Sequence, residues 1–230
     1  MGQYINKENK TMAANQTAGF GFRQAPTVGS TPATGGQAEY KIKSGLGVGI
    51  FKNNPVSPQH TAGDDGYLQD AAAGTMDDGI TGGAGWATST SNIQKLLGVF
   101  NGAFYIDNST SKPTYANSVA ASTTFAKDYN TGSNDGIGFV NDNPMQEYTA
   151  KCTAAVTQAQ LLYTFNPQDG ATTGTSEYGQ STVKLTNTGT ATTAMFRIVR
   201  VANDPANNDN SAVDSNVIVQ MSPSACKSNS

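Results

Sequence analysis

Few side chains in this sequence could do chemistry, and the single histidine is the first to weigh. His60 is the only histidine among the 230 residues. A Ser–His–Asp or Cys–His system would need it at the centre as the general base. It lies in the polar segment Pro58–Thr61, which has the composition of a loop. The sequence therefore favours an exposed loop residue at position 60 over a catalytic base.

Cys152 and Cys226 are the only cysteines, and they lie 74 positions apart. One disulfide between them is possible, but so low a count without a secretory signal fits free thiols better. Two cysteines and one histidine without close spacing also fail to complete a tetrahedral zinc site. The sequence predicts no zinc centre and leaves the pairing of the two thiols open.

The carboxylates offer two weaker possibilities. The pairs Asp64–Asp65 and Asp77–Asp78 resemble calcium loops, but they lack the alternating oxygen ligands that end in glutamate, so solvated turns explain them better. Glycoside hydrolysis needs two carboxylates brought together from distant strands. Only a few glutamates exist: Glu8, Glu39, Glu147 and Glu177. We therefore predict no catalytic, cofactor-binding or metal-binding residue, no cofactor, and a protein that is not an enzyme.

The glycine-rich segment Gly45–Gly49 (GLGVG) superficially resembles a phosphate-binding loop. It lacks the Lys–Ser/Thr pair of that motif, and no convincing helix follows to direct its N-terminus at a phosphate. A bend within a β-sheet is the better interpretation.

Charge and hydropathy argue against nucleic-acid and membrane partners. The 14 Lys and Arg residues are scattered and are outnumbered by 17 Asp and Glu, whereas phosphate binding needs clustered positive charge. No apolar run approaches the roughly 18 residues of a spanning helix. The first 20 residues lack the apolar core of a secretory signal, and Asn6 replaces the Ser or Thr of a myristoylation motif. We expect the chain to fold in the cytoplasm.

Neutral polar residues dominate the composition. Gly, Ser, Thr and Asn make up about 40% of the chain and charged residues 13%, well below the roughly 25% charged residues of an average domain. Thr favours strands, whereas Gly and Asn favour turns. The expected fold is all-β, an antiparallel sandwich or barrel-like domain with long loops.

The clearest element is a β-hairpin over residues 98–119. The runs Val99–Ile106 and Pro113–Val119 flank a polar turn at residues 107–112, which is the pattern of two paired strands. We expect its aromatic side chains to serve core and sheet packing rather than a binding site. They are Phe100, Phe104, Tyr105 and Tyr115.

Further short strand-like segments precede and follow the hairpin. They cover Glu39–Lys43, Gly49–Lys52, Thr123–Asp128, Gly136–Val140, Gln146–Cys152, Ser181–Thr186, Ala194–Val201 and Asn216–Met221. A turn is expected at Asn187–Gly189 and a loop over Asn203–Asp214. Ala154–Phe165 fits a short helix and a strand equally well.

The chain divides into an extended N-terminal arm (residues 1–20), a β-rich domain (21–222) and a flexible C-terminal tail (223–230). A loop-rich insertion is expected over residues 57–91, which includes Trp86. The polar arm either hangs free or pairs with a neighbouring subunit. We expect its removal to weaken assembly and to leave the β core folded.

Several short motifs follow one another in a fixed order along residues 20–221. They are Gly21–Pro26 (GFRQAP), Glu39–Ile42 (EYKI), Ile50–Val56 (IFKNNPV), Leu97–Gly102 (LGVFNG) with Tyr105 and Lys112–Pro113, Ile137–Pro144 (IGFVNDNP), Phe196–Val199 (FRIV) and Val217–Val219 (VIV). This series resembles a family of small virion structural proteins of tailed bacteriophages, of the kind common in marine phages. The insertion at 57–91 and the polar arm depart from the family's pattern.

The resemblance implies a component of the phage particle, most plausibly a decoration or cement protein on the capsid exterior, made in the host cytoplasm. Its implied partners are the major capsid protein lattice and further copies of itself, with a trimer favoured. The resemblance implies no catalytic residue. A tail or fibre component is the first alternative. A β-rich carbohydrate-binding or host-attachment protein is the second, suggested by Trp86 and nine tyrosines.

Overall fold

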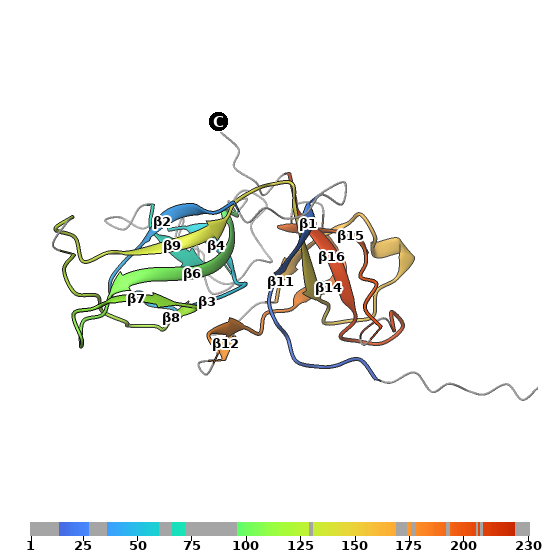
Figure 1. Ribbon diagram of the computed structural model, residues 1–230. Coiled ribbons are helices and arrows are strands. Elements are labelled where there is room, and N and C mark those ends of the chain that lie inside the picture. The colour runs from blue at the N-terminus through green and yellow to red at the C-terminus, as the bar shows by residue number, and fades with distance from the viewer. Residues whose placement is uncertain are drawn as a thin grey trace, which may run out of the picture.

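In the computed structural model, the regular secondary structure of the described residues is almost entirely β-strand, and the strands form two lobes (Figure 1). The structure describes residues 14–27, 36–59, 66–71, 96–128, 131–168, 174–175, 178–191, 194–205, 207 and 209–223. All strand pairs within its sheets are antiparallel. The expected all-β, antiparallel fold is therefore confirmed.

The first lobe is a curled sheet made from the middle of the chain. Its strand order is β2-β9-β6-β4-β5, and β7 pairs with β6. The two edge strands, β2 and β5, contact each other, so the sheet is barrel-like. A separate ribbon, β3-β8, completes the lobe. The bounds are β2 (Ala38–Ile42), β3 (Ile50–Phe51), β4 (Pro55–Pro58), β5 (Leu68–Asp70), β6 (Gly98–Ile106), β7 (Pro113–Ala116), β8 (Ser118–Val119) and β9 (Gly136–Asn141).

The core of the first lobe gathers alternate residues of these strands. Its buried members include Ile42, Ile50, Val56, Leu68, Phe100, Phe125 and Val140. Gly138 on β9 permits the tight curl, because a Cβ there would lie 2.5 Å from the Leu68 side chain.

The second lobe is a six-stranded sheet in the order β1-β10-β16-β15-β11-β14. A parallel bridge between Cys152 and Leu185 joins the end of β10 to the start of β14, so this sheet also closes on itself. Tyr148, Phe165, Phe196 and Val219 lie in its buried core. The bounds are β1 (Arg23–Thr27), β10 (Gln146–Lys151), β11 (Thr164–Pro167), β14 (Leu185–Ala191), β15 (Phe196–Val201) and β16 (Asn216–Met221).

The first lobe is inserted into the second along the chain. Strand β1 pairs with β10 in a register that includes Thr27 and Gln146, and every strand of the first lobe lies between these two in sequence. The second lobe therefore draws its strands from both sides of the first.

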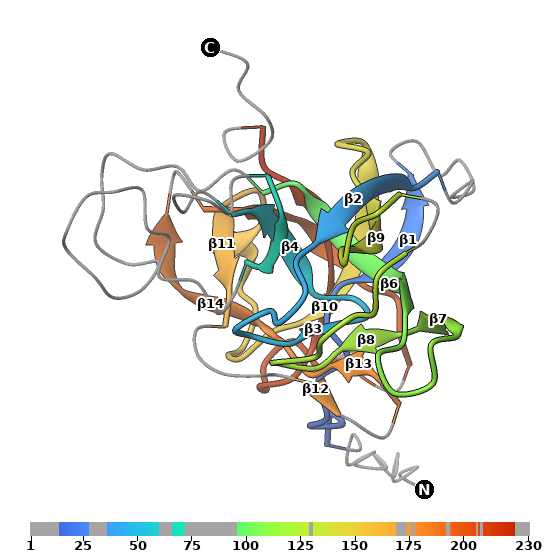
Figure 2. The same ribbon diagram turned by 90° about the vertical axis from the view of Figure 1, so that its left-hand side faces the viewer.

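Backbone hydrogen bonds join the two lobes. The small ribbon β12 (Gly174–Thr175) and β13 (Gln180–Ser181) lies beside β3 and β8 (Figure 2). The bonds run from Phe22 N to Asn53 O (2.9 Å), Lys52 N to Gly179 O (2.9 Å) and Ser181 N to Lys52 O (2.9 Å), while Gly21 N binds Val183 O within the second lobe (3.2 Å). Gly21 has φ +71° and its absent Cβ would lie 2.5 Å from Asn53 O, so only glycine fits this crossing.

The predicted hairpin is confirmed as β6 and β7, with Phe104 opposite Tyr115 and Ile106 opposite Pro113. Its second strand ends at Ala116 rather than Val119, because Ser118–Val119 form β8 and pair with β3. Its turn is held by the Asp107 carboxylate, which accepts hydrogen bonds from the backbone N–H groups of Thr110 (2.7 Å) and Ser109 (3.0 Å). These bonds, the one from Thr110 first, hold the pKa of Asp107 below its usual value. The turn is therefore fixed by its own side chain.

The structure overturns one local prediction and resolves another that was left open. The turn expected at Asn187–Gly189 is wrong, because these residues lie within β14. Asn187 is fully buried. Its side-chain amide accepts a hydrogen bond from Ala154 N and donates to the backbone oxygens of Ala154 and Ala155, so it is not available to stabilise a turn at its own position. The segment Ala154–Phe165, left open between helix and strand, contains a single 3₁₀ turn, η1 (Gln158–Gln160), followed by β11.

Two expected irregular regions contain ordered structure. Residues 14–20 of the arm pack against the second lobe of their own chain, with Asn15 only 9% exposed. The insertion at 57–91 starts within β4, and its residues 68–70 form β5, where Leu68 is 1% exposed. Its residues 72–91, including Trp86, lie outside the described ranges.

Candidate functional site: a buried polar network and two exposed apolar sites

A buried lysine is the most unusual polar residue of the second lobe. Lys151 ends β10 and is only 1% exposed. Its Nζ donates hydrogen bonds to the backbone oxygens of Gln16 and of Asp214 (3.2 Å for the latter). It also lies 5.9 Å from the centre of the Phe20 ring. Lys151 thus joins the N-terminal arm to the loop that precedes β16.

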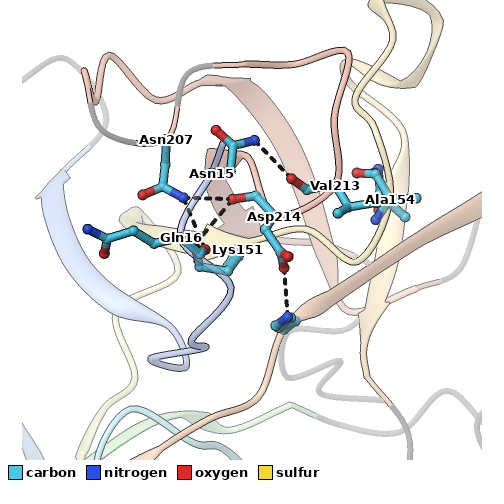
Figure 3. A network of polar contacts seen from close by, with 9 residues as sticks. Asn15, Gln16, Lys151, Ala154, Asn207, Val213 and Asp214 are labelled. Carbon is cyan, nitrogen blue, oxygen red and sulfur yellow. Dashed lines mark hydrogen bonds and ion pairs between the residues drawn. The ribbon is translucent and has the colours of Figure 1, made fainter. Parts of the chain in front are cut away.

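Two asparagines strengthen this junction (Figure 3). Asn207 Nδ2 donates to the same two oxygens, of Gln16 (3.2 Å) and Asp214 (3.0 Å). Asn15 Nδ2 donates to the backbone oxygens of Val213 (2.8 Å) and Asp209 (2.9 Å). Each of these side-chain donors binds main-chain carbonyl oxygens. The network therefore holds distant chain segments together, and its donors are already bound within the protein.

Burial lowers the pKa of Lys151, an effect that the nearby Asp214 carboxylate opposes. That carboxylate pairs with Lys184 Nζ at 2.6 Å. A lysine with a lowered pKa can act as a nucleophile, but a substrate has no access to a side chain enclosed to this degree. We interpret the network as structural.

Most sequence-level candidates for chemistry lie outside the described residues. These are His60, Asp64, Asp65, Asp77, Asp78, Glu8, Glu177 and Cys226. Cys152 is described, and its thiol is free and buried. Glu39 is exposed on β2 of the first lobe, whereas Glu147 is buried on β10 of the second lobe. Glu147 is bound by Arg200 through two hydrogen bonds (3.0 and 2.7 Å), and the two glutamates lie on strands of different lobes.

The glycine-rich segment 45–49 is a bend, as predicted. Gly45 N donates to Thr123 O (2.8 Å), Leu46 O accepts from Ser122 N (2.7 Å), and the Leu46 side chain enters the core. These two backbone groups are bound within the protein.

A first exposed apolar site lies where β7 meets the β12–β13 ribbon, and we call it the tyrosine site. Tyr115 is 76% exposed and packs one side of its ring on Phe104, at 4.7 Å between ring centres. Tyr178 is 65% exposed, and its backbone oxygen accepts a hydrogen bond from Asn117 (3.4 Å). Tyr115 was expected to serve core and sheet packing: it packs within the sheet against Phe104, its neighbour across β6 and β7, but it is not in the core.

A second exposed apolar site follows η1, at the end of the second lobe that points away from the first (the gold coil in Figure 1). Leu162 is 66% exposed and Tyr163 is 44% exposed. Sequence reasoning missed this site, because Leu161–Tyr163 carries the same apolar signal as a buried element. The one available hint was the absence of charge from Thr153 to Gln168.

Among the residues described, no three side chains of His, Cys, Asp or Glu are placed to hold a metal ion. The same residues include no helix long and apolar enough to cross a membrane. The fold and its exposed sites define a two-lobed, all-β protein. No protein-family model, curated protein or solved structure matches this chain.

Proposed function

We propose that this protein is a virion structural protein of a tailed bacteriophage, a capsid decoration or cement protein that binds and stabilises the assembled capsid. The observation that carries the proposal is the presence of two exposed apolar sites on different parts of a two-lobed molecule. Such a molecule is suited to contact two neighbouring subunits at once. The ordered sequence motifs resemble those of phage virion proteins, which is why we propose that these neighbouring subunits belong to a phage capsid.

Mass action explains how such contacts stabilise a particle. A protein that binds the assembled lattice and not the free subunits shifts the equilibrium toward assembly. Two weak sites in one molecule act together, because binding at the first raises the effective concentration at the second. A homo-oligomer, with a trimer favoured, adds further sites and matches the closed symmetry of capsid positions. In this proposal the protein lies on the capsid exterior after synthesis in the host cytoplasm.

Electron cryo-microscopy of the phage particle whose genome encodes this chain tests the proposal. We expect density for the two lobes on the outer capsid surface, bridging major capsid subunits. Particles made without the gene should lose their contents at lower temperature than complete particles. Density on the tail or on a fibre would establish the alternative virion role, and absence of the chain from purified particles would overturn both.

A second candidate is a carbohydrate-binding or host-attachment function at the tyrosine site. Tyr115 and Tyr178 are largely exposed, and Asn117, two residues after Tyr115, donates its side-chain amide to the backbone oxygen of Tyr178. Exposed tyrosines offer both apolar and hydrogen-bonding surface. A glycan array probed with the wild type and with a Tyr115→Ala, Tyr178→Ala variant separates the candidates. Binding that the variant loses would favour this function, and no binding by the wild type would remove it.

A further inference from the structure

The exposed site after η1 is built on a tight turn with an unexpected residue. Leu161 has φ −64° and ψ 139°, Leu162 has φ +69°, and Tyr163 N donates to Gln160 O at 3.3 Å. These values define a type II turn over Gln160–Tyr163. The third position of this turn normally holds glycine, because other side chains are strained there. Here it holds leucine.

Hydrogen bonds fix this turn from both sides. Leu162 N donates to Ile198 O (2.8 Å), and Ile198 N donates to Tyr163 O (3.1 Å). Gln160 Nε2 donates to Asn187 O (2.6 Å), which ties the turn to β14. The Leu162 and Tyr163 side chains are therefore presented by a backbone that has already been ordered, so a partner would not have to order it.

Folding does not account for this leucine. Its side chain is 66% exposed, so it contributes little burial, and its backbone conformation favours glycine. The neighbouring Leu161, in contrast, packs against the core of the second lobe. A residue that is both strained and exposed is better explained by a contact outside the chain.

The size and charge of the site indicate the kind of partner. No charged residue occurs from Thr153 to Gln168, and Arg197, which lies opposite Thr164 in β15, directs its guanidinium to Gln220 (2.9 Å). The surface that matches Leu162 and Tyr163 themselves is therefore apolar. A stable interface buries about 800 Å² on each partner, and two side chains such as these supply only about half of that at most. The site is thus too small to hold a dimer alone. It suits a partner that the protein also contacts elsewhere, as on a repeating lattice.

We propose that Leu162 and Tyr163 form a preformed anchor that inserts into an uncharged apolar recess of a capsid subunit. This inference rests on the proposed function and names the part of the second lobe that makes the contact. The first lobe would make a separate contact, through the tyrosine site.

The test compares particles that carry the wild-type chain with particles that carry a Leu162→Gly, Tyr163→Ser variant. Quantitative mass spectrometry of purified particles gives the number of copies per major capsid subunit. We expect the variant to fold, with the thermal unfolding midpoint of the wild type, because glycine suits the turn. Its copy number should fall at least tenfold. Val213→Thr is the matched control, since Val213 is 54% exposed on the same lobe, and it should keep full occupancy.

The possible outcomes are distinct. Absence of the wild-type chain from particles would refute the proposed function itself. Full occupancy by the folded variant would leave that function standing and overturn the anchor. A change in the variant's mass in solution, measured by light scattering, would make a second copy of the chain the occupant and would also overturn the proposal. If the double variant fails to fold, the copy number of Leu162→Asn decides in the same way, because asparagine tolerates positive φ.

Discussion

At the scale of single residues, Cys152 is a thiol whose surroundings suppress its reactivity. Burial raises the pKa of the Cys152 thiol to about 12. The thiolate is the reactive form, so an increase of about three pKa units lowers its population roughly 1000-fold at a given pH. In a Cys226→Ser variant, Ellman's reagent should therefore label no thiol in the folded protein at mildly alkaline pH. It should label one thiol after denaturation in guanidinium chloride.

Rapid labelling of the folded Cys226→Ser variant would show that the second lobe opens at Cys152. The bridge between Cys152 and Leu185 would then fail to close the sheet as described. Hydrogen exchange at the Thr153 amide, which donates to Leu185 O (3.0 Å), provides an independent measure of the same opening.

Lys151 yields a prediction with a definite dependence on pH. Replacing it with methionine leaves the Gln16 and Asp214 oxygens with one donor fewer and should lower the free energy of unfolding by about 1–3 kcal/mol at neutral pH. Burial lowers the folded-state pKa of Lys151 below the 10.5 of a free lysine, so the unfolded chain binds more protons in the window just below 10.5. The wild type should therefore gain stability relative to Lys151→Met as pH rises toward 10.5.

Urea unfolding of both proteins across this pH range gives the difference between their free energies of unfolding. Taking this difference cancels the titration of the groups that both proteins share. A difference that shrinks as pH rises would contradict the prediction. Lys112→Met, at an exposed position in the hairpin turn, is the control and should change the free energy of unfolding by less than about 0.5 kcal/mol.

Residue patterns in the sequence predicted burial better than they predicted contacts. The alternation from Ser181 to Thr186 gives the correct buried and half-buried positions, although residues 182–184 are not in a strand. The buried role of Lys151 was not predictable, because a lysine in an alternating strand is normally exposed. Its partners, Gln16 and Asp214, are distant in sequence and become neighbours only in the folded chain.

At the scale of elements, the N-terminal arm divides into two parts of different importance. A chain that starts at residue 14 retains the contacts of Asn15, Gln16 and Phe20, and we expect its free energy of unfolding to stay within about 0.5 kcal/mol of the wild type. A chain that starts at residue 21 loses these contacts and leaves buried Lys151 and Asn207 without some of their acceptors. It should lose about 2–4 kcal/mol.

Urea unfolding of the two shortened chains checks this prediction. Equal stability of both would mean that the contacts of residues 14–20 add nothing to the free energy of unfolding; unfolding of the chain that starts at residue 21 would contradict the expectation that the β core stays folded without residues 1–20. Particle occupancy by the chain that starts at residue 14 separately measures whether residues 1–13 serve assembly.

Strands with a local signal were predictable, and elements defined by distant partners were not. The hairpin of β6 and β7 has a polar turn, flanking apolar runs and pairing between neighbours in sequence. The extent of β14 depends on Asn187, whose buried amide binds Ala154 and Ala155, more than 30 residues earlier. The two exposed sites were missed for the same reason, because exposure of an apolar residue is set by what else packs there.

At the scale of the whole molecule, the two lobes should differ in how they respond to damage. The strands of the first lobe are continuous in sequence, so it can close without the second. The second lobe must bring β1 to β10, and a folded first lobe holds these ends together, which reduces the entropy cost of closure. Phe100→Ala in the first core should therefore weaken both lobes, whereas Phe196→Ala in the second core should weaken the second alone. Each change should cost about 3–5 kcal/mol in its own lobe.

Native-state hydrogen exchange reports each lobe separately through the amides of Ala103 in β6 and Ile198 in β15. In Phe196→Ala, protection should fall at Ile198 and persist at Ala103. Equal loss at both amides would mean that the lobes unfold as one unit through the hydrogen bonds at their junction.

The insertion of the first lobe between β1 and β10 also sets the order of events during synthesis. Gln146 leaves the ribosome 119 positions after its partner Thr27, an interval of roughly 6–24 s at common translation rates. The last strand of the first lobe, β9, ends at Asn141, five positions before Gln146, so β1 lacks its partner for nearly all the time that the first lobe takes to be synthesised. During that interval β1 is an open strand that can pair with the β10 of another chain. Strand-swapped dimers are thus the characteristic misfolded product of this topology, and they should increase with the rate of expression.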